Sequence, residues 1–262
     1  MRAVADARVL VTGGNAGIGA ETALGLARLG AAVAITARDP AKGEAAAARI
    51  RDAVPGAAVD VVDLDLASFA SIRRCADEVQ RRFDRLDVLV NNAGGAPPSD
   101  TATVSPKFST AIIALNLVAP LVFAQRAFAV MKDQPEGGVI VNIASVSGLR
   151  PSPGTAAYGA AKAGLVNLTQ TLGLEFAPRV RVVGVTVGLV RTEQAHLFYG
   201  DEAGVDAVGA TVPAGRMAEP SDVGDVCLLL ASPLARYVTG EHLVVHGGGE
   251  WPAYLRAANA GG

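Results

Sequence analysis

Short apolar runs alternate along the chain with stretches whose apolar residues recur at helical spacing. Continuous apolar runs of this length are typical of strands that are buried on both faces of a sheet. Helix-like stretches such as residues 16–30 and 68–83 lie between the runs. The predicted strands cover residues 7–12, 31–36, 57–62, 86–90, 138–144, 180–186 and 242–246.

This order of elements predicts an α/β protein. Strands that alternate with helices favour a doubly wound parallel sheet, here of about seven strands, with helices on both faces. The connections are short, and no linker rich in proline, serine or glycine divides the chain. We therefore expect a single domain that spans residues 1–262.

Composition and charge narrow the function. Half of the 262 residues are hydrophobic, which is enough for a large core and excludes a disordered chain. The net charge of −2 leaves no basic excess for phosphates, so we expect no nucleic-acid partner. The N-terminus has no signal-like apolar region, and no apolar run approaches the ~18 residues of a membrane span. Cys75 and Cys227 fit small buried residues in a reducing compartment, so we expect a cytoplasmic protein.

A glycine-rich turn follows the first predicted strand and opens a predicted helix, with the sequence TGGNAGIG at residues 12–19. Glycines permit a tight turn and a close approach of backbone N–H groups to a pyrophosphate, and the helix N-terminus adds a positive dipole. The spacing Gly-x-x-x-Gly-x-Gly differs from the three-glycine fingerprint of other dehydrogenases. An ordinary βα turn is the alternative, but the position between strand and helix favours dinucleotide binding.

The end of the second predicted strand bears on the choice of cofactor. An acidic residue ~20 positions past the glycines favours NAD, whereas an arginine favours the 2′-phosphate of NADP. Arg38 lies in this zone and can bind a phosphate with two N–H groups. Asp39 follows it and would serve as the acid if the turn were shifted. We predict a preference for NADP(H), with NAD(H) as the alternative.

Tyr158 and Lys162 lie four residues apart at the start of a predicted helix, so their side chains share one face. A neighbouring ammonium group stabilises a phenolate and lowers the pKa of the phenol, which then serves as an acid and base at a carbonyl or alcohol oxygen. A core tyrosine beside a surface lysine is the alternative. Ser145 ends a strand thirteen residues earlier, at the edge where ligands bind such sheets. Its hydroxyl can hold the reacting oxygen, with Ser147 as a nearby competitor.

Together these motifs resemble the short-chain dehydrogenase/reductase family in its single-domain branch. The matching features run in the family's order over nearly the whole chain. They are residues 12–19, 64–66, 91–94, 158–162 and 187–192, together with Asn116 and Ser145. The resemblance implies a Rossmann fold and an oxidoreductase that transfers hydride between a nicotinamide cofactor and a ketone or secondary alcohol.

The resemblance also implies roles for individual residues. Tyr158 would be the general acid/base, Lys162 would lower its pKa and hold the nicotinamide ribose, and Ser145 would orient the substrate oxygen. Asn116 would position a water molecule in a proton relay. The alternatives are that NNAG (91–94) is only a turn and that Asp65 is only a charge at a helix N-terminus. The implied cofactor contacts are Gly13, Asn15, Gly17, Ile18, Gly19, Arg38, Asp65, Leu66, Asn92, Ala93, Gly94, Tyr158, Lys162, Val190 and Thr192.

Pro120 supports the proposed role of Asn116 independently. Proline has no N–H, so the Asn116 carbonyl loses its helical partner and the helix is expected to kink there. We expect the freed carbonyl, beside Lys162, to hold the relay water.

Val187 stands where the family usually has proline, which predicts a looser loop after it. We interpret the three histidines as structural or surface residues and expect no metal site.

The substrate is less well determined by the sequence. The family places a variable lid at about residues 189–215, where Arg191 faces four acidic residues, and the C-terminal tail at about 250–262 adds apolar surface. An acidic lid repels phosphorylated and carrier-linked substrates. A related 3-oxoacyl-(acyl-carrier-protein) reductase is similar in its motifs but meets its carrier with two arginines, where this chain has Glu136 and Leu174. We therefore predict a mostly apolar, free small-molecule substrate.

Two further expectations remain. A catalytically silent dinucleotide-binding module is the alternative from another class, but such a module would not need Asn116, Ser145, Tyr158 and Lys162 together. The resemblance implies a homo-oligomer, a tetramer or a dimer, formed through the long helices around residues 106–132 and 155–177.

Overall fold

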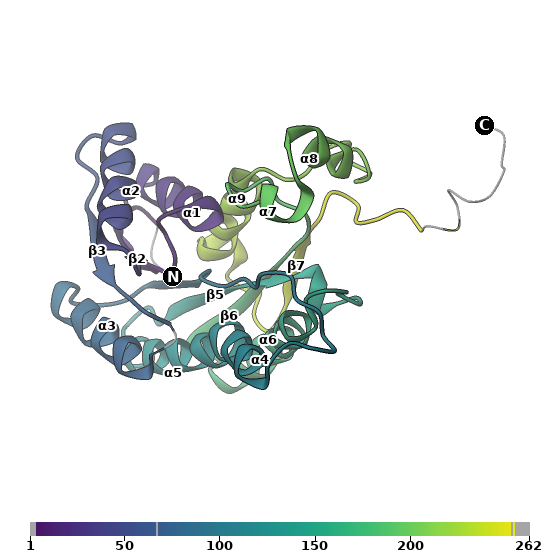
Figure 1. The fold of residues 1–262 in the computed structure, drawn as a ribbon. Helices are drawn as coiled ribbons and strands as arrows, with labels where there is room; N and C mark the ends of the chain where they lie inside the picture. Colours follow the sequence, from purple (N-terminus) through teal and green to yellow (C-terminus); the bar gives the residue numbers. More distant parts are fainter. Residues whose placement is uncertain (1–3, 67, 253, 255–262) are drawn as a thin grey trace.

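The computed structural model describes residues 4–66, 68–252 and 254, and its centre is one parallel sheet (Figure 1). Seven strands of these residues pair in the order β3-β2-β1-β4-β5-β6-β7. The order reverses between β1 and β4, which is where doubly wound sheets bind ligands at the carboxyl ends of their strands. The predicted α/β fold is confirmed. The strands are β1 (Arg8–Val11), β2 (Ala32–Ala37), β3 (Val59–Asp63), β4 (Val88–Asn91), β5 (Gly138–Ser145), β6 (Val180–Val187) and β7 (His242–Val245).

Helices cover both faces of the sheet (Figure 1). One face carries α1 (Gly17–Arg28), α2 (Pro40–Ala53) and α9 (Pro220–Ala231). The other carries α3 (Phe69–Arg82), α4 (Pro106–Ile113), α5 (Ala119–Met131) and α6 (Ala156–Glu175). The short helices α7 (His196–Tyr199) and α8 (Glu202–Gly209) form a separate lobe in the segment predicted as a lid.

Side-chain alternation along the strands produces two cores. In β1, Val9 and Val11 face the α1, α2 and α9 layer, whereas Leu10 faces the α3, α5 and α6 layer. Both sets are buried, which explains why the strands read as continuous apolar runs. Cys75 and Cys227 are free thiols, one in each core, as predicted. Burial raises the pKa of each thiol to about 12, so both are unreactive at neutral pH.

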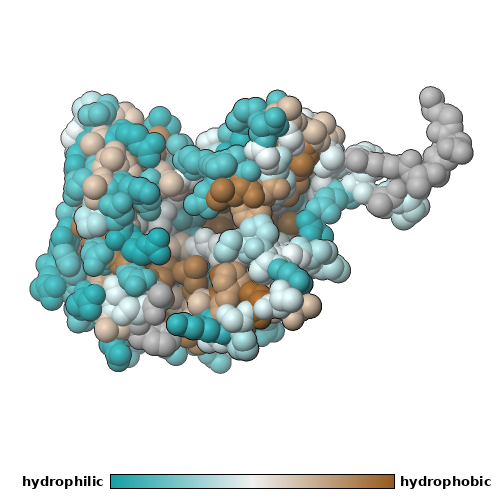
Figure 2. Space-filling model, viewed as in Figure 1, coloured by the Kyte–Doolittle hydropathy of each residue, from teal (hydrophilic) through white to brown (hydrophobic). Residues whose placement is uncertain are grey.

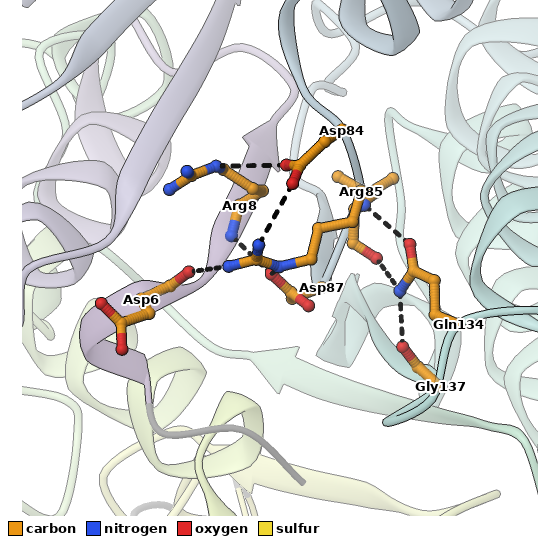
Figure 3. A network of polar contacts seen from close by, with 8 residues as sticks. Asp6, Arg8, Asp84, Arg85, Asp87, Gln134 and Gly137 are labelled. Carbon is orange, nitrogen blue, oxygen red and sulfur yellow. Dashed lines mark hydrogen bonds and ion pairs between the residues drawn. The ribbon is translucent and has the colours of Figure 1, made fainter.

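Charged groups bind the amino ends of the central strands together, at the edge opposite the predicted site (Figure 3). The Asp87 carboxylate accepts hydrogen bonds from the Arg8 backbone N–H at 2.7 Å and from Arg85 Nε at 2.9 Å. Gln134 donates through Nε2 to the carbonyls of Leu86 and Gly137, at 2.8 and 2.7 Å. This network fixes β1, β4 and the start of β5 relative to one another.

One apolar segment passes a membrane-span test by length and composition alone. Residues Pro106–Met131 form 26 helical residues, which include an 18-residue window with a mean hydropathy of 1.8. The helix packs instead as a core helix, because Phe123, Ala127 and Met131 are buried against the sheet. No continuous apolar run within this helix approaches 18 residues, because Asn116, Gln125 and Arg126 interrupt it.

The same helix contains the distortion predicted at Pro120. Residues Ala114–Val118 form a π-helical turn, labelled η2, between α4 and α5, and Pro120 lies in the first turn of α5. The missing proline N–H thus widens the helix at Asn116 without ending it.

Candidate active site

The glycine-rich turn connects β1 to α1 at the carboxyl edge of the sheet. Gly13 and Gly17 have positive φ values of 63° and 51°, which side chains disfavour. Gly19 is required for a different reason. A β-carbon on it would lie 2.3 Å from the Gly13 carbonyl oxygen and 2.4 Å from Asn92 Nδ2. The turn is therefore a compact cradle whose backbone is open to a phosphate group.

Neighbouring strands hold this cradle in place. The Thr12 hydroxyl accepts hydrogen bonds from the N–H groups of Asn92 and Ala93, at 3.0 and 3.1 Å. Asn92 Nδ2 donates in return to the carbonyls of Thr12 and Gly13, at 2.9 and 3.1 Å. Thr36 in β2 accepts from the Gly13 N–H at 3.0 Å. The NNAG segment thus supports the turn directly and is more than a strand-end turn.

Arg38 and Asp39 follow β2, and the structure separates their roles. The Asp39 carboxylate accepts hydrogen bonds from the N–H groups of Ala41 and Lys42, at 3.0 and 3.4 Å, and so caps α2. Arg38 is exposed, and no hydrogen bond or ion pair engages its guanidinium among the described residues. Asp39 therefore has a structural role through Oδ1, and the Arg38 guanidinium is exposed to a ligand.

Ser145 is the last residue of β5, so its hydroxyl lies at the carboxyl edge of the sheet. It makes a side-chain hydrogen bond with Tyr158, which lies in the first turn of α6. Ser147 contributes its backbone N–H to Ser145 Oγ, at 3.2 Å. Between the two serines, the hydroxyl that reaches the phenol is that of Ser145.

Lys162 is buried below Tyr158, one helical turn further along α6. Its Nζ lies 5.6 Å from the centroid of the Tyr158 ring and donates a hydrogen bond to the Ile143 carbonyl at 2.7 Å. Only 4% of the residue is exposed, and burial lowers the pKa of Lys162 to about 8. The carbonyl bond fixes the ammonium group at the face of the phenol.

The expected effect of Lys162 on the phenol is not what the structure gives. Burial raises the pKa of Tyr158, and the hydrogen bond with Ser145 opposes that change only in part. The reason is desolvation, which favours the neutral phenol. Tyr158 is therefore protonated at neutral pH, as a proton donor must be.

Asn116 lies on the π-helical turn and is fully buried. Its Nδ2 donates to the carbonyls of Gly95 and Ile112, each at 2.9 Å, and its Oδ1 accepts from the Gly95 N–H at 2.9 Å. A β-carbon on Gly94 would lie 2.6 Å from Asn116 Oδ1 and 3.4 Å from Lys162 Nζ. Gly94 therefore allows the Asn116 amide and the Lys162 ammonium to approach the same point.

The other predicted contacts lie at the same edge of the sheet. Asp65 and Leu66 follow β3, and the Asp65 N–H donates to Ser71 Oγ at 2.9 Å. Val190 forms a parallel bridge with Ala218, and the next turn brings Thr192 against Gly17. These positions agree with a dinucleotide that extends across the sheet from β3 to β6.

Comparisons with known proteins identify the family. A family model described as enoyl-(acyl carrier protein) reductase matches residues 13–250. Several curated short-chain dehydrogenases and reductases match more than nine-tenths of the chain at over 30% identity. The chain belongs to the short-chain dehydrogenase/reductase family.

Relatives in this family act on different substrates. The chain is 33% identical to a 3alpha-hydroxysteroid dehydrogenase of Mediterraneibacter gnavus, over 91% of this chain and 94% of that protein. It is 34% identical to a 3-oxoacyl-(acyl-carrier-protein) reductase of Aquifex aeolicus, over 91% and 95%. A crystal structure of an actinorhodin polyketide ketoreductase variant with NADPH matches 95% of this chain and 98% of that one, with a TM-score of 0.87 and 32% identity. The chain is therefore an NAD(P)-dependent oxidoreductase that acts on ketones or alcohols.

A cavity of about 510 Å³ lies beside the Ser145 end of β5. Its walls are mainly apolar, and its polar rim includes an ion pair between Arg150 and Glu250. Figure 2 shows apolar side chains in the hollow between the α7–α8 lobe and the body of the molecule. The apolar lining residues are Val146, Leu149, Leu189, Val212 and Val244.

The lid segment is organised by its one arginine. Arg191 forms ion pairs with Glu202 and with Asp206, the latter at 2.9 Å. Val187 itself is buried at the end of β6 and pairs with Ser145 on one side and Val245 on the other, and the looser loop after it stays a prediction. Most of the predicted tail at 250–262 lies outside the described residues.

Four supporting features were not predicted from the sequence. The Thr12 and Thr36 hydroxyls brace the glycine-rich turn, the Ile143 carbonyl holds Lys162, and Glu193 reaches Gly17 from the lid. A buried chain of hydrogen bonds also joins Asn91, Asn142 and Thr169 and thereby ties α6 to β4 and β5. The positions of Thr12 and Thr36 at strand ends were the available sequence signal for their role. The remaining contacts depend on packing between residues far apart in the chain.

Proposed function

We propose that this enzyme reduces an uncharged, mostly apolar ketone with NADPH, and that Tyr158 is its general acid/base. The observation that carries the proposal is the convergence of Ser145, Tyr158, Lys162 and Asn116 beside a dinucleotide cradle and an apolar cavity. A silent binding module would need no buried ammonium group at a phenol face. We further propose that residues 1–262 form a single domain and that the protein is cytoplasmic.

A nicotinamide cofactor held by the glycine-rich cradle would supply the hydride for the carbonyl carbon. The Ser145 hydroxyl donates a hydrogen bond to the carbonyl oxygen and holds it near Tyr158. Tyr158 gives its proton to that oxygen as the alcohol forms, and the Lys162 ammonium stabilises the phenolate that remains. The Asn116 side-chain amide is already engaged by Gly95 and Ile112. The Asn116 main-chain carbonyl, which loses its helical partner at Pro120, would therefore hold the water molecule that returns the proton through Lys162.

The residues present fit a dinucleotide. The cradle at Gly13, Gly17 and Gly19 brings the backbone close to the N-terminus of α1, where the helix dipole suits a pyrophosphate. Arg38 supports the preference for NADP(H), because its guanidinium is exposed beside the turn, whereas the Asp39 carboxylate already caps α2 through Oδ1. NAD(H) remains the alternative cofactor.

The cofactor preference is tested by Arg38→Ala. We expect the KM for NADPH to rise about five- to tenfold, because one charged hydrogen-bonding partner of the 2′-phosphate is lost, while the KM for NADH stays unchanged. Steady-state kinetics with both cofactors on a panel of ketones and quinones measures this. Equal efficiency with the two cofactors in the wild type, unaffected by the substitution, would show that the preference is wrong.

A free substrate is favoured over a carrier-linked one. The cavity walls are apolar, the Arg150 charge on its rim is balanced by Glu250, and the lid carries an acidic excess around Arg191. At the positions where the related carrier-protein reductase has arginines, Glu136 and Leu174 are both exposed and offer no cation to an acidic carrier. Efficient turnover of an acyl-carrier-protein thioester would overturn this part of the proposal.

We also propose that the enzyme is a homo-oligomer, a dimer or a tetramer. The outer face of α6 supports this, because it exposes the small residues Ala156, Ala160 and Ala163, which allow a second helix to approach closely. Leu174 near the end of the same helix is 81% exposed, an apolar surface suited to an interface.

A further inference from the structure

Glu193, at the start of the lid, reaches across to the glycine-rich turn. The Gly17 N–H donates a hydrogen bond to Glu193 Oε1 at 3.3 Å, between residues 176 positions apart. The second carboxylate oxygen lies 3.6 Å from the point where a β-carbon on Gly17 would stand, and Thr192 Cγ2 lies 3.4 Å from it. The lid therefore begins in contact with the first residue of α1.

Helix α1 has no side-chain cap of its own. Its N-cap is Ala16, which makes no side-chain hydrogen bond, and its first turn holds no acidic residue. By contrast, Asp39, Ser68 and Asp201 cap α2, α3 and α8 with their own side chains. The open N–H groups and the helix dipole leave α1 with an anion-binding end, and Glu193 is the carboxylate that contacts it.

We propose that Glu193 competes with the pyrophosphate of the dinucleotide for the amino end of α1, so that cofactor binding releases the start of the lid. This inference rests on the proposed dinucleotide site. A carboxylate and a pyrophosphate cannot both occupy the Gly17 N–H, because like charges at that distance repel and the donor is single. Glu193 therefore weakens the affinity for cofactor and links its binding to the position of the lid.

The contacts around Glu193 define which part of the lid is released. Before it, the Val190–Ala218 bridge keeps the chain attached to the body. After it, Ala195 and Tyr199 pack with Leu189, which also lines the cavity. Release of Glu193 thus frees the turn that leads into α7 while the base of the segment stays in place, and the cavity wall next to Leu189 is the part that adjusts.

The test is Glu193→Gln, which keeps the side-chain length and an acceptor oxygen but removes the charge. Calorimetric titration of the purified protein with NADP⁺ and with NAD⁺ gives the two dissociation constants. We expect both to fall by the same factor, about three- to tenfold, because the two cofactors share one pyrophosphate. Hydrogen exchange of residues 192–199 in the protein without cofactor should become faster, because the contact to Gly17 is weakened.

Glu202→Gln is the matched control, since Glu202 is a lid carboxylate that pairs with Arg191 and not with the turn. It should leave both dissociation constants unchanged. Unchanged or weaker binding in Glu193→Gln, an effect confined to one cofactor, or an equal effect in Glu202→Gln would overturn this inference alone. If neither cofactor binds the wild type, the dinucleotide site is wrong, and the proposed function fails with it.

Discussion

At the scale of single residues, the candidate site depends on two ionisable groups with opposite needs, the half-buried Tyr158 and the buried Lys162. Tyr158 must be neutral before it can donate a proton, and burial favours that form. Lys162 must be charged to stabilise the phenolate, and burial opposes that form. The Ile143 carbonyl resolves this conflict, because it gives the ammonium group a fixed partner at 2.7 Å.

Lys162 is therefore expected to cost stability. With the folded pKa at about 8 against 10.5 in the unfolded chain, its charge destabilises the fold by about 3 kcal/mol below pH 8. The unfolded state binds more protons between these values, so the free energy of unfolding rises with pH from about 8 to 10.5 through this group. Lys162→Met should raise stability at pH 7 by about 1–2 kcal/mol, since the lost hydrogen bond offsets part of the gain.

Urea denaturation of both proteins at pH 7 and at pH 10 measures this. The difference between them should shrink at the higher pH, and the variant should be inactive. A variant that is less stable at pH 7, with a difference that does not change with pH, would show that the ammonium group is not destabilising.

At the scale of elements, the glycine-rich turn and NNAG form one unit that must close tightly. Gly19→Ala would place a methyl group 2.3 Å from the Gly13 carbonyl oxygen, so the turn must shift. We expect the dissociation constant for NADP⁺ to rise at least about tenfold, with a stability loss of about 1–3 kcal/mol. Calorimetry and thermal melting measure the two effects.

Gly25→Ala in the same helix is the control for that experiment. Its methyl group would meet only the ends of the flexible Leu228 side chain, at 2.9 Å and 3.0 Å. Affinity for NADP⁺ should be retained in this variant. Loss of binding in both variants would point to a general effect on α1 and not to the shape of the cradle.

Most elements of this fold could be predicted from the sequence, because its central strands β1, β2, β4, β5 and β6 are buried on both faces and consist mainly of valine, isoleucine, leucine and alanine. The turn at Gly13–Gly19 could also be predicted, because its glycines are required by the local backbone geometry. The rise in the pKa of Tyr158 could not be predicted, because it depends on burial of the phenol by several elements. Contacts such as Glu193 to Gly17 join residues 176 positions apart and have no local signal.

At the scale of the whole molecule, the proposed assembly into a dimer or tetramer can be tested at the exposed face of α6. If α6 is an interface, Ala163→Arg places a long charged side chain on the face of Ala160 and Ala163 and should separate the subunits. Light scattering should give a multiple of 26.5 kDa for the wild type and a smaller mass for the variant.

Ala48→Arg on the exposed face of α2 is the matched control and should keep the wild-type mass. A wild type of 26.5 kDa would contradict the proposed oligomer. Equal masses for the wild type and Ala163→Arg would move the interface away from this face of α6.

The most direct test of the account compares wild type and Tyr158→Phe in a single turnover of a reducible ketone with bound NADPH, followed by nicotinamide absorbance. The variant keeps the ring but lacks the proton donor, so the rate should fall by about 10²–10⁴-fold while the dissociation constant for NADPH stays within about twofold. A variant that oxidises NADPH as fast as the wild type would contradict the central claim that the Tyr158 hydroxyl delivers the proton.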